Sequence, residues 1–208
     1  MANTLETIQA QRIIAIVRLE NYDWAVSVAQ ALLDGGISVI EFTLTGSGVH
    51  RAITDVRREF GDRMRIGVGT VLSPTEAEAA IEVGAEFVVT PVVQPAVIAA
   101  CRQFAIPVMC GAMTPTEAWT AHNAGADLIK IFPARVGGPE FIRDLLAPLP
   151  QLRVVPTGGV SASNVRAYLE AGAVAIGAGG KLIAPQVVEQ RDWAAITAQA
   201  RAYREALS

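Results

Sequence analysis

The chain has 208 residues, of which 51% are hydrophobic and 18% charged, and its formal net charge is −3. This length suits one substantial core, the scattered basic residues argue against nucleic acid as the main partner, and no apolar run of about twenty residues suggests a membrane span. The amino-terminal residues lack the pattern of a signal peptide, and Cys101 and Cys110 lack CxxC spacing. We therefore expect a cytoplasmic protein without a membrane partner.

Short apolar runs alternate with longer helical segments along the chain, and this alternation predicts parallel strands joined by crossover helices. The expected strands are 13–17, 37–43, 65–71, 87–90, 107–110, 128–132, 154–157 and 174–177. The expected helices include 24–33, 74–83, 116–123, 162–171 and 192–207, the last with Trp193, Ile196, Ala200 and Tyr203 on the face that packs inward.

Glycine precedes the second, fourth, sixth and eighth expected strands, in Asp34-Gly-Gly, Val83-Gly, Ala124-Gly and Ala171-Gly. A glycine at this place supplies the left-handed turn that ends a helix. Eight parallel strands in about 200 residues predict an α/β fold of the (β/α)8 TIM barrel type, with a doubly wound open sheet as the alternative. Because no linker or low-complexity stretch interrupts the pattern, we expect one domain over residues 1–208.

Lys130 is one of only two lysines in the chain, the other being Lys181. It stands in the apolar run Asp127-Leu-Ile-Lys-Ile-Phe-Pro133, where burial of an ammonium is costly. A buried lysine with a lowered pKa is a nucleophile that forms Schiff bases with carbonyl compounds. The alternative is a lysine at a strand end whose amine reaches solvent.

Glu41 interrupts a second apolar run, Ile37–Phe42. Side chains alternate along a strand, so Glu41 and Thr43 share one face of their strand, as Lys130 and Phe132 do of theirs. If both faces point inward, Glu41 and Lys130 face each other across the barrel. A carboxylate there can move protons for a Schiff-base lysine, and we favour this over a buried ion pair that is only structural.

Two glycine-rich segments follow the last two expected strands. Thr157-Gly-Gly-Val-Ser-Ala-Ser-Asn164 comes after the seventh, and Gly177-Ala-Gly-Gly-Lys181 after the eighth. The backbone amides of these two loops commonly bind phosphate in barrel enzymes. Ser161 and Ser163 are better interpreted as helix N-caps, and Lys181 either adds charge to the phosphate or lies in solvent.

Taken in order, short motifs from residue 12 to residue 183 resemble the 2-keto-3-deoxy-6-phosphogluconate (KDPG) and 4-hydroxy-2-oxoglutarate (KHG) aldolase family. They are Ile14-Ala-Ile-Val-Arg18, Ile40-Glu-Phe-Thr43, Gly67-Val-Gly-Thr-Val71, Val89-Thr-Pro91, Met113-Thr-Pro-Thr-Glu117, Ile129-Lys-Ile-Phe-Pro133, Gly137-Gly-Pro139 and Pro156-Thr-Gly-Gly-Val160. Each motif is short, but the ordered set is specific.

The resemblance implies a class I aldolase, usually a homotrimer, that needs no metal or other cofactor. Lys130 matches the Schiff-base lysine and Glu41 the general acid/base. The substrate is expected to be a phosphorylated 2-keto-3-deoxy sugar acid that yields pyruvate, and the principal assignment is KDPG, with glyceraldehyde 3-phosphate as the other product. The galactonate analogue of KDPG and KHG are the alternative substrates. Further residues match the substrate-binding site: Thr70, Pro91, Phe132 and Thr157 around the pyruvyl group, and Gly158, Gly159, Gly179 and Gly180 around the phosphate.

The chain departs from the common family pattern at two positions. Many members have an arginine that binds the pyruvate carboxylate where this chain has Thr45, and Arg18 is expected to replace it by a charge-assisted contact. A phosphate-binding serine often follows the glycine after the eighth strand, and Gly180 stands there instead.

Two other kinds of function remain open at this point. One is a phosphate-binding barrel enzyme in which Glu41 promotes epimerisation or phosphate-ester synthesis and Lys130 acts only by its charge. The other is a non-catalytic, anion-binding barrel that has kept the fold. Metal-dependent aldol cleavage is disfavoured because His50 and His122 are isolated and no carboxylates converge with them.

Overall fold

Eight parallel strands form the centre of the computed structural model, which describes residues 3–208. The strands are β1 (Ile13–Val17), β2 (Val39–Thr43), β3 (Arg65–Gly69), β4 (Phe87–Val89), β5 (Val108–Ala112), β6 (Leu128–Ile131), β7 (Val154–Pro156) and β8 (Ile176–Ala178). Their order in the sheet is β7-β6-β5-β4-β3-β2-β1-β8, and a parallel bridge between Thr157 and Gly177 joins the two outermost strands. The predicted (β/α)8 barrel is therefore confirmed, and the open sheet is wrong.

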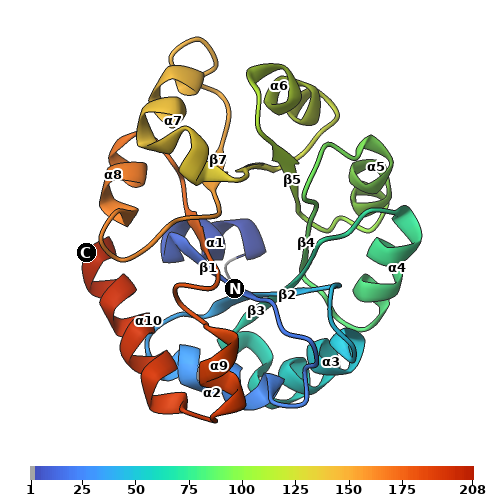
Figure 1. The fold of residues 1–208 in the computed structure, drawn as a ribbon. Coiled ribbons are helices and arrows are strands. Elements are labelled where there is room, and N and C mark those ends of the chain that lie inside the picture. The colour runs from blue at the N-terminus through green and yellow to red at the C-terminus, as the bar shows by residue number, and fades with distance from the viewer. Residues whose placement is uncertain (1–2) are drawn as a thin grey trace.

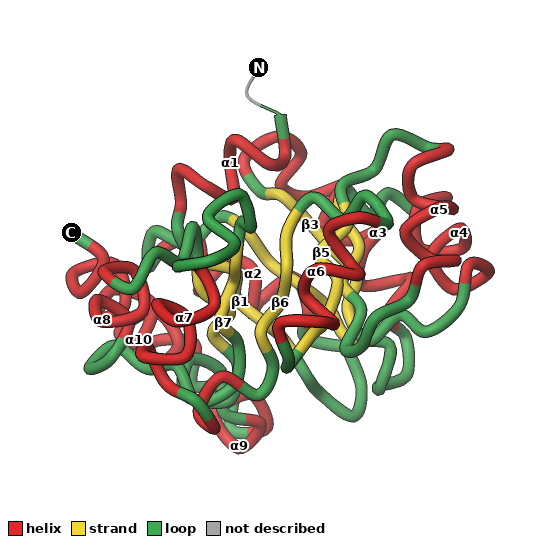
Figure 2. Tube along the Cα trace, turned by 90° about the horizontal axis from the view of Figure 1, so that it is seen from above, coloured by secondary structure: helices red, strands yellow, loops and turns green. Residues whose placement is uncertain are grey.

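Helices surround this barrel on the outside (Figure 1). They are α1 (Thr4–Gln11), α2 (Ala25–Asp34), α3 (Val49–Phe60), α4 (Pro74–Glu82), α5 (Pro95–Gln103), α6 (Pro115–Asn123), α7 (Gly138–Leu146), α8 (Val165–Glu170), α9 (Pro185–Glu189) and α10 (Trp193–Leu207), with short 3-10 turns η1 (Gly61–Arg63) and η2 (Ala134–Val136). The exception is α1, which lies across the end where the strands begin (Figure 2). The opposite end, where the strands finish, is left to the loops.

All eight predicted strands are present, and their limits differ from the prediction by a few residues. The second strand begins at Val39, although the apolar run begins at Ile37. Ile37 is fully buried but lies between the turn that follows α2 and the start of β2. An apolar run reports burial rather than membership of the hydrogen-bonded ladder, so the pattern extends past the true end of the strand.

The four glycines that end helices adopt the predicted left-handed conformation. Their φ angles are +86° at Gly36, +105° at Gly84, +98° at Gly125 and +104° at Gly172. Residues with a Cβ rarely adopt this conformation, so each glycine allows the chain to turn sharply from a helix into the next strand.

The loops after β3 and β5 are fixed by the same local sequence, Ser-Pro-Thr-Glu before α4 and Thr-Pro-Thr-Glu before α6. Ser73 accepts a hydrogen bond from the Glu76 amide, and the Glu76 carboxylate accepts from the Ser73 and Leu72 amides. Thr114 and Glu117 repeat the arrangement in α6. These capping boxes hold two of the loops that surround the open end of the barrel in one conformation.

Two separate apolar cores hold the barrel together. The larger one lies between strands and helices, and it includes Ile196, Ala200 and Tyr203 of α10, as predicted for that helix; Trp193 is only partly buried. The smaller core fills the barrel itself. Residues 1–2 lie outside the described part of the chain, so the extent of the single domain over 1–208 stays a prediction.

Candidate active site

The barrel interior contains a lower layer of apolar side chains near the beginning of the strands. The lower layer consists of Ile14, Val39, Phe87, Val89, Met109, Leu128, Val155 and Ala175, and Ile8 of α1 packs against it from below. The layer fills the barrel and α1 covers it, so access to the interior is from the end where the strands finish.

An upper layer of polar or small residues lies two residues further along six of the strands, whereas β1 has the apolar Ile16 at this level. It consists of Glu41, Gly69, Gly111, Lys130, Thr157 and Gly177. Within residues 3–208, the buried threonine, glutamate and lysine residues are Glu41, Thr43, Thr90, Lys130 and Thr157, and all five stand in or just after the second half of a strand. Buried polar groups therefore gather at one end of the barrel, as in barrel enzymes.

Glu41 of β2 and Lys130 of β6 face each other across this layer. The distance from Lys130 Nζ to Glu41 Oε1 is 4.0 Å, and the two side chains are 0% and 4% exposed. This distance is too long for a direct hydrogen bond and leaves room for a shared water molecule or substrate oxygen. Both carboxylate oxygens of Glu41 lack a hydrogen-bond partner within residues 3–208. Buried carboxylates normally have partners, so both oxygens of Glu41 are available to bond a group that enters the barrel.

Glycines create the space around the pair. A Cβ at Gly69 would collide with the Glu41 carboxylate, one at Gly111 with the backbone of Pro91, and one at Gly177 with Thr157 Oγ1. Gly111 is also the direct strand neighbour of Lys130. Larger residues at these positions would fill the hollow that a small substrate needs, so the size of the upper layer is set by the sequence.

Burial raises the pKa of Glu41 above its usual value, and the positive charges of Lys130 and then Arg18 oppose this shift without cancelling it. A carboxyl group with a raised pKa keeps its proton closer to neutral pH, where it can act as a general acid and, once ionised, as a general base. Lys130 Nζ also lies 5.4 Å from the centre of the Phe132 ring, which gives its cationic form a second favourable contact.

A cavity of about 690 Å³ opens beside the upper layer, at the end where the strands finish. Predicted site residues that line it are Arg18, Phe132, Thr157, Gly158, Gly159, Gly179 and Gly180. The two glycine loops after β7 and β8 thus meet in one hollow together with Arg18 of the first loop.

Five predicted residues are not part of the lining of this cavity: Glu41 and Lys130, which lie in the upper layer, and Thr45, Thr70 and Pro91. Thr45 is exposed and lines an adjoining hollow of about 430 Å³ with Arg18, and its hydroxyl is bonded to that of Thr43 at 2.8 Å. Pro91 follows β4 and packs against Gly111. Thr70 follows β3 and has a φ of +63°, which is rare for a β-branched residue and is more frequent at functional sites than elsewhere.

Two residues near the site were not predicted from the sequence. Arg135 of η2 lines the cavity but belongs to no recognised motif. Tyr22 is buried, donates a hydrogen bond to the Thr43 carbonyl at 2.7 Å and accepts one from the Thr43 amide at 3.1 Å. It therefore links the loop after β1, which carries Arg18, to the end of β2. Neither residue stands at a strand end, and only the folded chain brings them to the site.

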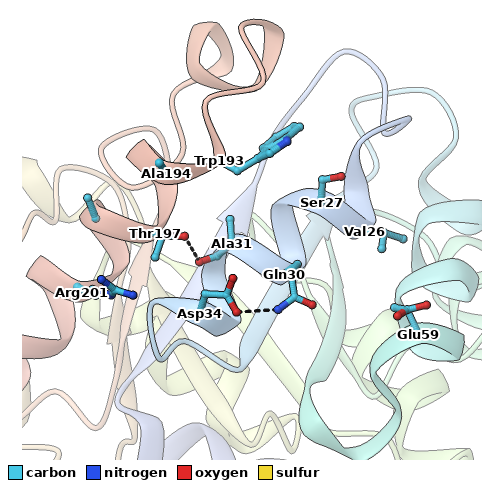
Figure 3. Close-up of a pocket in the computed structure, with 11 residues that line it drawn as sticks. Val26, Ser27, Gln30, Ala31, Asp34, Glu59, Trp193, Ala194, Thr197 and Arg201 are labelled. Carbon is cyan, nitrogen blue, oxygen red and sulfur yellow. Dashed lines mark hydrogen bonds between the residues drawn. The ribbon is translucent and has the colours of Figure 1, made fainter.

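A second groove, of about 900 Å³, lies on the outer wall between α2, α3 and α10. Figure 3 shows its lining, in which Thr197 donates to the Ala31 carbonyl at 2.9 Å and Gln30 donates to Asp34 at 2.7 Å. Its residues come from helices and from no strand end, and these two hydrogen bonds join residues within its wall. We interpret it as the contact between packed helices.

Three further features of residues 3–208 concern metal binding, membrane insertion and the two cysteines. No three His, Cys, Asp or Glu side chains among residues 3–208 are grouped so that they could hold a metal ion. None of the helices described is both long and apolar enough to cross a membrane. Cys101 and Cys110 are free and buried, and burial raises the pKa of the Cys101 thiol to about 11, so it is a poor nucleophile.

Comparison with known proteins agrees with the geometry. The model of the KDPG and KHG aldolase family matches residues 5–199. The chain belongs to this family. It is 34% identical to the 2-dehydro-3-deoxy-6-phosphogalactonate aldolase of Escherichia coli over 94% of this chain and 96% of that one. It is also 34% identical to the 2-dehydro-3-deoxy-phosphogluconate aldolase of Pseudomonas aeruginosa, over 94% and 88% of the two chains.

A solved structure of a relative extends the comparison to the barrel as a whole. The KDPG aldolase of Legionella pneumophila, captured with pyruvate as a covalent carbinolamine, superposes with a TM-score of 0.86 at 27% identity, over 94% of this chain and 97% of that one. Membership of the KDPG and KHG aldolase family makes this chain an aldolase, and hence a carbon–carbon lyase.

Proposed function

We propose that this aldolase reversibly cleaves 2-keto-3-deoxy-6-phosphogluconate to pyruvate and glyceraldehyde 3-phosphate through a Schiff base on Lys130. The observation that carries the proposal is the buried Lys130, 4.0 Å from a buried Glu41 that has no hydrogen-bond partner within residues 3–208. Catalysis by an amine needs a proton carrier beside it, and the two groups meet in a hollow bounded by glycines.

The unprotonated amine of Lys130 attacks the C2 ketone of the substrate and forms a carbinolamine. Glu41 supplies a proton to the departing hydroxyl, and water leaves with formation of the iminium ion. Ionised Glu41 then takes the proton of the C4 hydroxyl, the C3–C4 bond breaks and its electron pair moves into the iminium. The aldehyde leaves, and protonation of the enamine followed by hydrolysis gives pyruvate and restores Lys130.

Substrate orientation in this proposal comes from the groups around the pair. Arg18 is the cation that acts on Glu41 in addition to Lys130, so its guanidinium is suitably placed to bind the carboxylate at C1. Thr70, Pro91, Phe132 and Thr157 bound the pyruvyl moiety, and Thr45 stands where many family members have a carboxylate-binding arginine. The loops containing Gly158, Gly159, Gly179 and Gly180 offer backbone amides to the phosphate.

The test is reduction with borohydride in the presence of pyruvate, followed by mass spectrometry of the intact protein and of its peptides. We expect a pyruvyl adduct on the peptide that contains Lys130 and none on Lys181, which serves as an internal control because it is exposed. Samples without pyruvate, and a Lys130→Met variant, should remain unmodified. A folded wild-type sample that forms no adduct would favour the epimerase-like or the non-catalytic alternative.

The 6-phosphogalactonate analogue is a second candidate substrate. Identity to the E. coli enzyme that is named for it, at 34%, equals identity to the P. aeruginosa gluconate enzyme. The two substrates differ at one carbon, so kcat/KM should be measured for both, and for 4-hydroxy-2-oxoglutarate. A higher value for the galactonate compound would replace the principal assignment without affecting the Schiff base.

We further propose that the enzyme is a cytoplasmic homotrimer. Leu72, Val92, Trp119 and Val136 are exposed apolar residues that follow β3, β4, β5 and β6. These four strands are neighbours in the barrel, so one side of the molecule carries apolar surface that suits association. Light scattering after gel filtration should give three times the mass of the chain, and a monomer at micromolar concentration would contradict the proposal.

A further inference from the structure

The cavity beside the upper layer is unusual in its charge. Its lining includes three cations, Arg18, Arg135 and Lys181, and no aspartate or glutamate, although the whole chain has a net charge of −3. Within residues 3–208, none of these three cations forms an ion pair with an aspartate or a glutamate. A hollow with one sign of charge raises the local concentration of a ligand of opposite charge.

Unused backbone amides point to the same ligand. The N–H groups of Gly158, Gly159, Gly180 and Lys181 donate to no acceptor in the described part of the chain. Gly158 and Gly159 have φ angles of +87° and +91°, and the Asn164 side chain donates to the Gly159 carbonyl at 3.0 Å. The turn is thus held in one conformation while its amides remain available for an anion.

Arg135 is attached directly to this turn. Its amide donates to the Gly158 carbonyl at 2.9 Å, and the preceding Ala134 amide donates to the Thr157 carbonyl at 2.7 Å. A Cβ at Gly159 would overlap Arg135 Cβ, so the absence of a side chain at Gly159 allows the arginine to lie against the loop. Tyr168 donates to the Ala134 carbonyl at 3.2 Å and fixes the far side of η2.

We propose that Arg135 is a specificity-determining residue that binds the terminal phosphate of the substrate, with Lys181 as a second cation. This inference rests on the proposed function and names the part of the site that distinguishes phosphorylated from unphosphorylated substrates. A guanidinium forms two parallel hydrogen bonds with a phosphate. In this chain it replaces the hydroxyl donor that is missing at Gly180, while Arg18 is assigned to the substrate carboxylate.

The experiment measures inorganic phosphate binding by calorimetry to the full-length wild type and to Arg135→Met, Lys181→Met and Arg166→Met. Arg166 is an exposed arginine of α8 outside the cavity, so its variant controls for the loss of one positive charge. We expect Arg135→Met to weaken phosphate binding by about 10- to 100-fold, the usual effect of losing a charge-assisted contact. Lys181→Met should have a smaller effect and Arg166→Met none.

A kinetic readout separates recognition from a structural role. The ratio of kcat/KM for the phosphorylated substrate to that for its unphosphorylated analogue should fall about 10-fold or more in Arg135→Met, and Arg135→Lys should recover part of it. Arg135→Gln is a second variant that also removes the charge but differs in shape from methionine. The same fall in the ratio in both variants would show that misfolding of the methionine variant is not its cause. Equal phosphate affinity in wild type and Arg135→Met, no measurable phosphate binding to the wild type, or an unchanged ratio would overturn the proposal.

The borohydride experiment keeps this proposal separate from the proposed function. A wild type that forms the Lys130 adduct but binds phosphate without help from Arg135 would remain an aldolase and reject the inference. A wild type that binds phosphate through Arg135 but forms no adduct would retain the inference and reject the Schiff base.

Discussion

The lower and upper layers of the barrel interior come from the same strands, and corresponding residues are two positions apart, yet they are opposite in character. Two positions after Leu128 comes Lys130. In the same way, Glu41 comes two positions after Val39, and Gly111 two after Met109. The lower layer is filled with apolar side chains and covered by α1, whereas the upper layer contains a buried ion pair and spaces left by glycine. The apolar packing that stabilises the barrel lies in the lower layer, and the residues proposed for catalysis lie in the upper layer.

The upper layer lowers the stability of the fold. Burying a carboxylate and an ammonium takes more free energy than their attraction returns, unless hydrogen bonds complete the pair. Glu41 has no such bond among residues 3–208. A well-packed lower layer two residues away compensates for this cost, so the molecule tolerates a polar cluster that would be unfavourable in a core of its own.

The largest effect is expected from Lys130→Arg. The charge is kept, but a guanidinium does not form the imine, so turnover should fall by about 10³-fold or more, as when other covalent nucleophiles are removed. Aldol cleavage coupled to lactate dehydrogenase, which reports pyruvate, measures the change. Lys130→Met controls for the larger size of arginine. Turnover within about 10-fold of wild type in either variant would sink the Schiff-base mechanism.

Glu41→Gln should have the next largest effect. The amide keeps the shape of the carboxyl group but cannot carry the proton, and we expect kcat to fall by about 10²- to 10⁴-fold, the usual contribution of a general acid/base. The pyruvyl adduct on Lys130 should still accumulate, only more slowly, when trapped with borohydride over hours. Normal rates of both adduct formation and turnover would limit Glu41 to a structural role.

Two glycines of β3 allow a direct test of the two layers. Gly67 and Gly69 are two residues apart, and a side chain added at either position would point into the barrel. A Cβ at Gly69 would displace the Glu41 carboxylate, whereas a Cβ at Gly67 would press on the ring of Phe87 in the lower layer. Gly69→Ala should lower kcat by about 10- to 100-fold, as expected for a displaced catalytic group. Gly67→Ala should instead lower the free energy of unfolding by about 1–3 kcal/mol.

Urea unfolding and steady-state kinetics of both variants distinguish these outcomes. Each variant is the control for the other, because the strand, the direction of the side chain and the substitution are the same. If both alanines reduce stability equally and leave kcat unchanged, the division of the barrel into a stabilising and a chemical layer is wrong.

Part of this division could be predicted from sequence, since inward orientation of both strand faces would bring Glu41 and Lys130 together, and glycine motifs mark the ends of β7 and β8. Arg135 could not be predicted, because its relation to the site depends on contacts between η2 and the Gly158–Gly159 turn. Tyr22 was missed for a similar reason, since its hydroxyl reaches Thr43 across two loops. Periodicity reports which face a residue occupies, but tertiary contacts decide which loops meet.

The smallest effect concerns the pH dependence of stability. Because the pKa of Glu41 is raised in the folded protein above its ordinary value of 4.5, the folded state binds more protons than the unfolded state in the pH range from 4.5 up to the raised value. Stability must therefore fall as pH rises through that range. Glu41→Gln removes the group, so the variant should gain stability relative to wild type as pH rises, with the smallest difference near pH 4.5.

Chemical denaturation of both proteins across a series of pH values measures this difference, and Glu140→Gln is a suitable control because Glu140 is exposed on α7. The free energy of unfolding of this control should change with pH in the same way as that of the wild type. A difference between Glu41→Gln and wild type that shrinks as pH rises would mean that attraction to Lys130 and Arg18 outweighs burial. The upper layer would then stabilise the barrel through its ion pair, and the contrast with the lower layer would lie in chemistry alone.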